Sequence, residues 1–417
     1  MRWRGGLLLG LVLFTGIACA GTREVYVWQR QFGPEIAASL NTLQPVIDGA
    51  CVLAAEVSWT GGRMRVVRPT LDYAPLIALK KPIGLALRIG AFAGPFAADD
   101  DTARALGEIA AEFIHRAQTA GLTVAEIQID FDAAESKLAG YREWLGGWRR
   151  HIGRTPLVFT ALPAWLRHAE FRALAQTADG FVLQVHSLER PAGIAANFSL
   201  CDPDRAAAWA RQAGEAGVPF RIALPTYGYV LGFDPRGKFL ALVAEGPRPV
   251  WPKGTQVRVV RADAPALARF AQTLTAAPPP HCTGVIWYRL PVASDRLNWD
   301  VITLETVLRG ELPAKSLRAE VVWAEPGLAE ISIINRGQTT EPLPPEVKIA
   351  WAGGERVVAS DGLAGFFLEM HRGEAQAIVR AADVPVDAFL APGRHAKIAW
   401  LRFAHEISLE VLLPAPP

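Results

Sequence analysis

Between residues 22 and 312, short strand-like runs alternate with helical patterns in a regular series. Eight runs carry the branched and aromatic residues typical of strands, at 25–30, 51–59, 83–92, 124–132, 156–163, 180–186, 220–228 and 282–291. Helical patterns are clearest at 101–120, 137–150, 166–177, 202–216, 265–276 and 299–309. Because parallel strands need long crossover connections, this alternation is typical of a helix-covered parallel sheet. Eight units predict an α/β fold closed into a (β/α)8 TIM barrel.

Two insertions interrupt the series, and its character changes at the end. Residues 60–69 predict a hairpin turned at Gly61 and Gly62, and residues 229–261 hold strand-like runs at 239–244 and 256–260. Since the second insertion follows the seventh strand, we expect it to form a wall at the top face of the barrel, where the strands' carboxyl ends lie. Further on, short runs between Gly and Pro turns predict strands at 317–323, 328–334, 347–351, 365–370, 375–379 and 407–412. They predict a barrel over 22–312 followed by an all-β sandwich-like domain over 316–413.

Residues 1–20 have the features of an export signal, with Arg2 and Arg4 before an apolar run from 7 to 18. Ala18 and Ala20 suit a small-x-small cleavage site, whereas residues 16–19 resemble a bacterial lipobox with Gly where Leu is usual. The apolar run is too short for a typical spanning helix. We therefore expect a periplasmic or exported protein, and we favour a soluble form slightly over a membrane-anchored lipoprotein with its lipid on Cys19.

Composition argues against several classes of partner. Lys and Arg total 43 against 41 Asp and Glu, for a formal net charge of +2, so nucleic acid is not expected as a partner. The cysteines at 19, 51, 201 and 282 show neither an evident pairing nor a metal-ligand spacing, which favours buried free thiols. With no Gly-rich phosphate loop either, we expect neither a metal nor another cofactor.

The run at 124–132 reads Val-Ala-Glu-Ile-Gln-Ile-Asp-Phe-Asp and has one apolar and one acidic face. In a barrel strand the apolar face packs under the helices, and the acidic face points to the barrel axis. Buried carboxylates are costly unless they are paired, and sites in this fold lie at the carboxyl ends of strands. Asp130 and Asp132 therefore predict a functional site, with a structural ion-pair network as the alternative.

Other predicted strands end in polar and aromatic residues that converge on the same face of the barrel. They are Trp28, Glu56, Arg88, Gln184, His186, Tyr227, Trp287, Tyr288 and Arg289. Arg88 with Glu56 could equally form a salt bridge within the barrel. Carboxylates combined with His, Tyr and Trp favour glycoside cleavage, in which one carboxyl group protonates the departing oxygen and another stabilises or attacks the anomeric centre.

The hypothesis assigns a role to most members of this set. Asp132 or Glu135 would be the acid and Asp130 its electrostatic partner, since repulsion between neighbouring carboxylates raises one pKa. Glu56 is a second candidate for the other functional carboxylate. Substrate would be oriented by Arg88 and His186 and stacked on Trp28, Trp287 and Tyr227.

Four segments resemble an uncharacterised bacterial family, the domain of unknown function DUF3142. They are the strand at 127–132 followed by 136–138 and Tyr141, the strand at 183–188 with Pro191, and the segments 223–228 and 284–291. The resemblance covers most of the barrel and implies a TIM barrel related to glycoside hydrolases, without a settled activity.

The fourth strand is also loosely similar to the chitinase-like glycosidases, whose pattern is Asp-x-x-Asp-x-Asp-x-Glu. Aligning Asp130 and Asp132 with its last two Asp residues places Ala134 where that family has its catalytic Glu, and Glu135 stands one position late. The sequence thus predicts an exported protein that binds an oligosaccharide or polysaccharide and leaves hydrolysis open. The alternatives are a non-catalytic binding or scaffold protein of the cell envelope, and an assembly protein acting through the C-terminal domain.

Overall fold

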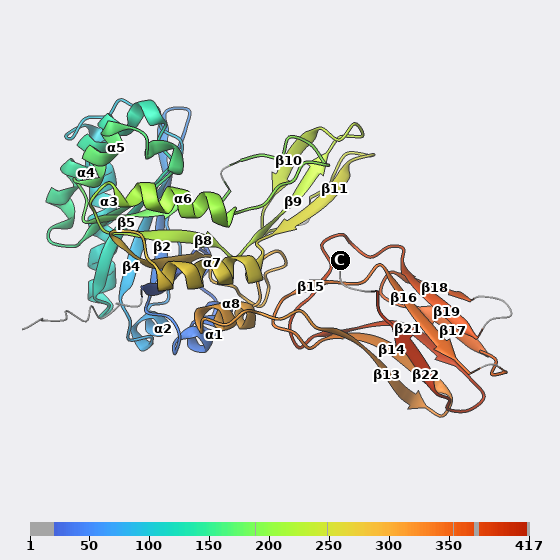
Figure 1. The fold of residues 1–417 in the computed structure, drawn as a ribbon. Coiled ribbons are helices and arrows are strands. Elements are labelled where there is room, and N and C mark those ends of the chain that lie inside the picture. Colours follow the sequence, from blue (N-terminus) through green and yellow to red (C-terminus); the bar gives the residue numbers. More distant parts are fainter. Residues whose placement is uncertain (1–20, 188, 248, 353, 371–374, 415–417) are drawn as a thin grey trace, which may run out of the picture.

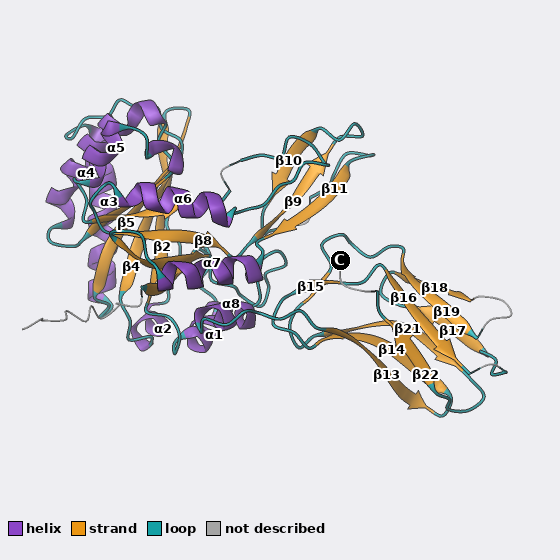
Figure 2. Ribbon diagram, in the orientation of Figure 1, coloured by secondary structure: helices purple, strands orange, loops and turns teal. Residues whose placement is uncertain are grey.

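The computed structural model describes residues 21–187, 189–247, 249–352, 354–370 and 375–414. The predicted export signal and Cys19 lie outside these residues. A barrel domain is followed by a domain built of strands (Figures 1 and 2). Of the helices in the described part of the chain, none combines the length and the apolar character needed to cross a membrane.

The predicted eight-stranded barrel is confirmed. Its strands are β1 (Thr22–Val27), β2 (Gly49–Thr60), β4 (Ile83–Ile89), β5 (Val124–Phe131), β6 (Leu157–Ala161), β7 (Gly180–Gln184), β8 (Phe220–Pro225) and β12 (Cys282–Tyr288). They pair in the order β1-β12-β8-β7-β6-β5-β4-β2, and parallel pairing of β1 with β2 closes the barrel.

Helices occupy the crossovers between these strands, as predicted. They are α1 (Pro34–Leu43), α2 (Tyr73–Ala78), α3 (Asp101–Thr119), α4 (Leu138–Ile152), α5 (Ala169–Ala175), α6 (Pro203–Gly214), α7 (Ala264–Ala276) and α8 (Val301–Leu308). Aspartate side chains cap several of them: those of Asp100, Asp202 and Asp263 accept hydrogen bonds from backbone N–H groups in the first turn. The start of each of these helices is therefore determined by its own local sequence.

The two faces of the barrel strands differ as the alternation in β5 predicts. Ile127, Ile129 and Phe131 are buried in the core between the barrel and its helices. Inside the barrel a small apolar cluster fills the middle level, formed by Tyr26, Cys51, Ala86, Val158, Val182, Ala223 and Ile286. The barrel interior is therefore packed at this level, and a ligand can enter only between this cluster and the carboxyl ends of the strands.

Both insertions form antiparallel strands. β3 (Arg63–Val67) folds back on β2 through the turn at Gly61 and Gly62. β9 (Gly228–Phe233), β10 (Phe239–Val243) and β11 (Gln256–Arg261) form a three-stranded sheet in the order β10-β9-β11, which projects from the barrel (Figure 1). The second insertion therefore contains one strand more than predicted.

The C-terminal strands form two four-stranded antiparallel sheets around a second core, which confirms the sandwich-like domain. One sheet has the order β13-β14-β21-β17, with β13 (Leu317–Glu325), β14 (Leu328–Asn335), β17 (Ala359–Gly362) and β21 (His395–Arg402). The other has the order β18-β19-β16-β22, with β16 (Glu346–Trp351), β18 (Phe366–Met370), β19 (Gln376–Ala381) and β22 (Leu409–Leu412). β15 (Glu341–Pro342) and β20 (Phe389–Leu390) pair separately as a short ribbon.

Candidate functional site

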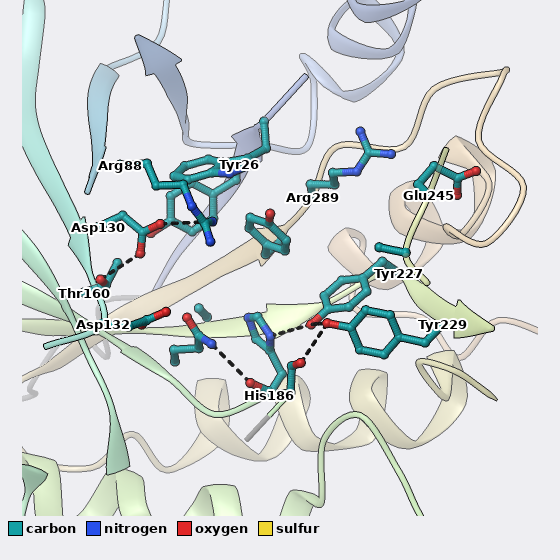
Figure 3. A pocket seen from close by; sticks show the side chains of 16 residues that line it. Tyr26, Arg88, Asp130, Asp132, Thr160, His186, Tyr227, Tyr229, Glu245 and Arg289 are labelled. Carbon is teal, nitrogen blue, oxygen red and sulfur yellow. Dashed lines mark hydrogen bonds and ion pairs between the residues drawn. The ribbon is translucent and has the colours of Figure 1, made fainter. Parts of the chain in front are cut away.

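A cavity of about 310 Å³ opens at the carboxyl ends of the barrel strands. Most of the predicted site residues line it: Trp28, Arg88, Asp130, Asp132, Gln184, His186, Tyr227, Tyr288 and Arg289. Figure 3 shows the two acids facing His186 and the tyrosines across the cavity. The volume is at the lower end of the range for small-molecule sites, so the cavity suits a small ligand or the end of a longer one.

Asp130 lies in β5 and Asp132 directly follows its last residue, and the two have different surroundings. The Asp130 carboxylate accepts a 2.9 Å hydrogen bond from Thr160 Oγ1, lies 3.4 Å from Arg88 Nη1, and has a side chain only 13% exposed. Asp132 is exposed to the cavity. Loss of hydration raises the pKa of both carboxyl groups, and the charge of Arg88 opposes that rise in each case.

Beneath the acids, a hydrogen-bonded column runs down the barrel axis. The Tyr26 hydroxyl donates to Gln128 Oε1 at 2.6 Å, and Gln128 Nε2 donates to Glu126 Oε1 at 2.7 Å. Arg221 pairs with Glu126 at 2.5 Å and also with Glu24. This ion-pair network lies at the opposite end of the barrel from Asp132. The structural ion pair weighed as an alternative for the two acids corresponds instead to the contact of Asp130 with Arg88.

His186 lies across the cavity from the acids and is part of a chain of hydroxyl groups. Tyr229 donates a hydrogen bond to the Tyr227 oxygen at 3.4 Å, and the Tyr227 oxygen lies 3.0 Å from His186 Nδ1. Ser187 Oγ lies 2.7 Å from the Tyr229 oxygen. With Tyr229 as donor, the Tyr227 hydrogen is available to Nδ1, so the His186 hydrogen resides on Nε2. Burial lowers the pKa of His186 to about 3, and the ring is therefore neutral at physiological pH.

Aromatic rings form the wall next to Arg88. The Trp28 ring lies with its centroid 5.2 Å from that of Tyr26 and 5.5 Å from that of Tyr288, both edge to face. The His186 ring stacks on Tyr288 at 5.7 Å. Flat apolar surfaces combined with a few hydrogen-bonding groups are the features that bind the faces and hydroxyl groups of a sugar ring.

The insertion after the seventh strand forms part of the cavity wall, as expected. It contributes Tyr229 from β9 and, after β10, Ala244 and Glu245. Beside them, Arg289 pairs with Asp295 at 2.5 Å, and this pair is largely buried. The cation of Arg289 is thus already neutralised by the protein, as that of Arg88 is by Asp130.

Trp287 was predicted to stack on substrate, and that prediction is wrong. Its side chain is 2% exposed, and its ring lies 5.4 Å from that of Trp299 in the core outside the barrel. Strand alternation explains the position, because Ile286 and Tyr288 point inward and Trp287 must then point outward.

Glu135 and Glu56 were also placed in the site, and neither lines the cavity. Glu135 lies in a 3-10 turn, where its carboxylate is 2.6 Å from both His168 and Arg167, and these hydrogen bonds lower its pKa. A carboxyl group held ionised in this way cannot serve as a proton donor. Glu56 is paired with Arg30 at 2.5 Å instead of with Arg88.

Several lining residues were not assigned to the site from the sequence: Tyr26, Thr160, Ser187, Tyr229, Ala244 and Glu245. Tyr26 shares a strand face with Trp28, and Thr160 is an inward polar residue in an apolar strand. The alternation of side chains along the strands could therefore have identified both residues as facing the site. The positions of Tyr229 and Glu245 depend on how the insertion folds back onto the barrel, and strand parity does not reveal that.

Comparison with known proteins agrees with the resemblance inferred from the sequence. The model of the family described as Domain of unknown function (DUF3142) matches residues 87–293. No match is found among curated proteins.

Solved structures with a similar fold include a chitinase from Chromobacterium violaceum, which is 16% identical to this chain. The match covers 70% of this chain and 98% of the chitinase chain, with a TM-score of 0.46. The Bacillus cereus spore cortex-lytic enzyme SleL has 12% identity, coverage of 70% and 74%, and a TM-score of 0.47. The C-terminal domain of a putative chitinase from Desulfitobacterium hafniense has 11% identity, coverage of 70% and 98%, and a TM-score of 0.49. At such identities these structures do not indicate which residues act.

Proposed function

We propose that this chain, whose residues 87–293 match the family DUF3142, binds a carbohydrate in the barrel cavity and hydrolyses a glycosidic bond there. The observation that carries the proposal is the unequal environment of two carboxyl groups at the carboxyl end of β5. Thr160 and Arg88 favour the ionised form of Asp130, whereas Asp132 is open to the cavity. In this proposal the ion pair with Arg88 assigns the negative charge to Asp130, and Asp132, which reaches the cavity, holds the proton.

The proposed reaction uses this difference. Asp132 protonates the departing glycosidic oxygen as the glycosidic bond breaks, and ionised Asp130 stabilises the positive charge that develops at the anomeric carbon. A water molecule then adds to the anomeric carbon, and its proton passes to the Asp132 carboxylate. Trp28 and Tyr288 support the face of the sugar ring. The neutral His186 presents its Nε2–H group as a hydrogen-bond donor for a ligand oxygen.

A second candidate function is carbohydrate binding without turnover, and a specific observation favours it. Ala134 follows Asp132 at the next alternate position, and Glu135 is turned away toward Arg167 and His168. Of the acids that line the cavity, Glu245 accepts hydrogen bonds from two backbone N–H groups and is thereby occupied. Turnover would then depend entirely on the shorter side chain of Asp132.

The two functions can be separated with a panel of cell-wall and exopolysaccharide fragments, scored for new reducing ends and for binding by calorimetry. We expect the wild type to cleave at least one fragment, and Asp132→Asn to reduce turnover by about 10²–10⁴-fold while binding persists. Asp204→Asn, an exposed site on α6, is the matched control. Wild-type protein that binds a fragment without cleaving it would establish the binding function in place of hydrolysis.

An extracytoplasmic location is also part of the proposal, on the basis of the export signal in residues 1–20. Cell fractionation tests it, with Cys19→Ala separating the two forms. A lipoprotein would move from the membrane to the soluble fraction in this variant, whereas a soluble exported protein would not change its fraction.

A further inference from the structure

The segment 295–298 lies directly behind the cavity wall. Its first residue, Asp295, pairs with Arg289, and the backbone N–H groups of Arg296 and Leu297 donate to the Glu245 carboxylate at 2.9 and 2.8 Å. Arg289 and Glu245 both line the cavity. The position of this segment therefore determines the position of two wall residues.

The opposite side of the same segment contacts the C-terminal domain. Arg296 Nη1 lies 2.5 Å from the Asp387 carboxylate, whose side chain is 9% exposed, and Nη2 donates to the Gly246 carbonyl oxygen at 2.5 Å. One guanidinium thus contacts the C-terminal domain and the loop that carries Glu245. Asp387 lies two residues before β20.

Arg261, at the end of β11, makes a second connection between the same parts. Its Nε donates to the Leu297 carbonyl oxygen and its Nη1 to that of Thr340, both at 3.1 Å. It also donates to the Asn298 carbonyl oxygen, and its guanidinium lies 4.7 Å from the centre of the Phe389 ring. Thr340 directly precedes β15, and Phe389 begins β20. Both connections therefore reach the β15–β20 ribbon.

From these contacts we infer that the β15–β20 ribbon is a docking element that holds the cavity wall in place, and that Arg296 is the positioning residue that links Asp387 to Glu245. The inference goes beyond the proposed function, because it applies equally to a hydrolase and to a binding protein. It assigns the C-terminal domain a role in shaping the site, although none of the domain's described residues lines the cavity.

The geometry around Arg296 explains how the link works. Its guanidinium lies 2.5 Å from Asp387, but its Nε is 3.8 Å from the Glu245 carboxylate. Because Asp387 neutralises the cation, Glu245 keeps its oxygens for the two backbone N–H groups. Without Asp387 the partly buried cation needs another anion, and Glu245 is the nearest one among the ion pairs of Arg296. The carboxylate would then leave the backbone groups and the wall would loosen.

Hydrogen exchange measured by mass spectrometry on the full chain tests this inference without any ligand. We expect Asp387→Asn and Arg296→Met to accelerate exchange about tenfold in peptides covering 244–246 and 296–297, while peptides covering β5 are unaffected. Glu369→Gln is the matched control, because it removes a 2.7 Å ion pair with Arg380 inside the C-terminal domain.

Two results would overturn the inference. One is unchanged exchange at 244–246 and 296–297 in both variants. The other is equal acceleration in β5, which would mean a global loss of stability. Since no carbohydrate is present, failure here leaves the proposed function untouched, and a failure to find glycan turnover leaves this inference untouched.

Discussion

Asp132 is the residue on which the proposed chemistry depends, and the pH profile of the reaction reports on it. Loss of hydration raises its pKa above the ordinary Asp value. Since the acid must be protonated, kcat/KM should fall as pH rises through this raised pKa.

Asp130→Asn should move that fall to lower pH, because it frees Arg88, whose charge lowers the pKa of Asp132, from its ion pair with Asp130. The measurement is kcat/KM against pH for the wild type and Asp130→Asn on a fragment that the wild type cleaves. If kcat/KM falls at the same pH in both proteins, Asp130 does not affect the pKa of Asp132, and the proposed partnership of the two carboxyl groups is contradicted.

His186 should make the folded protein sensitive to acid. Its pKa is about 3 in the folded chain, against an ordinary 6.5, so between these pH values the unfolded chain binds a proton that the folded chain does not. Stability is then full above the unfolded pKa and declines as pH falls toward the folded one. From about pH 6.5 to about pH 4.5 this single group costs about 2–3 kcal/mol.

His186→Gln should flatten that decline, because glutamine does not titrate. The test is urea unfolding of both proteins near neutral pH and near pH 4.5. His115→Gln, an exposed position on α3, is the control and should retain the wild-type slope. An identical acid slope in His186→Gln would show that other groups cause the loss of stability.

The sequence predicted every barrel strand, because apolar periodicity reports directly on which side chains are buried. Parity along a strand also identified Asp130, Asp132 and Arg88 as inward residues. Parity failed for Trp287, since adjacent residues of one strand cannot both point inward and Tyr288 takes that side. It also cannot locate residues such as Glu245, whose place in the cavity depends on tertiary contacts with Arg296 and Leu297.

β21 was not predicted, although it is an inner strand of the C-terminal domain. Its polar and charged residues His395, Lys397 and Arg402 weaken the apolar pattern. Ile398, Ala399 and Leu401 are nevertheless buried in the second core. A register shift in its pairing with β14 interrupts the alternation, so two successive residues of this strand are buried and a strict period of two is absent.

Gly284, in β12, permits the close approach of the first and last barrel strands. Its φ is +156°, and a Cβ there would overlap the backbone of Thr22, which pairs with it across the closing strands. Gly284→Ala must therefore separate β1 from β12, and we expect a loss of roughly 3 kcal/mol or more in the free energy of unfolding. Urea unfolding measures it, with Gly33→Ala as the control because no atom lies within 4 Å of the added Cβ. Equal stability of the two variants would contradict the structure at this closure.

The barrel and the C-terminal domain have separate hydrophobic cores, and several polar contacts join the two domains. The barrel core and the core of the C-terminal domain form distinct clusters of buried residues. Between them lie the Arg296–Asp387 ion pair, the contacts of Arg261, and a 2.6 Å hydrogen bond from Thr303 to the Gln338 carbonyl oxygen. Polar contacts of this kind couple two domains only as long as each buried donor keeps its acceptors.

Arg261 donates hydrogen bonds to Leu297, Asn298 and Thr340, so it should determine whether the two domains unfold together. Burial lowers its pKa to about 10, yet it remains charged near neutral pH and donates to carbonyl oxygens of both domains. Arg261→Met keeps most of the side-chain volume but leaves these oxygens without a donor, at a cost of about 3 kcal/mol. Calorimetry of the wild type should show one transition, and Arg261→Met should split it into two because the barrel and the C-terminal domain then unfold independently.

Arg258→Met is the matched control. Arg258 lies on the same strand but donates to Ile194 and Ala196 within the barrel domain, so its loss should lower the transition temperature without splitting the transition. If the wild type already unfolds in two steps, or if both variants give a single transition, Arg261 does not couple the domains.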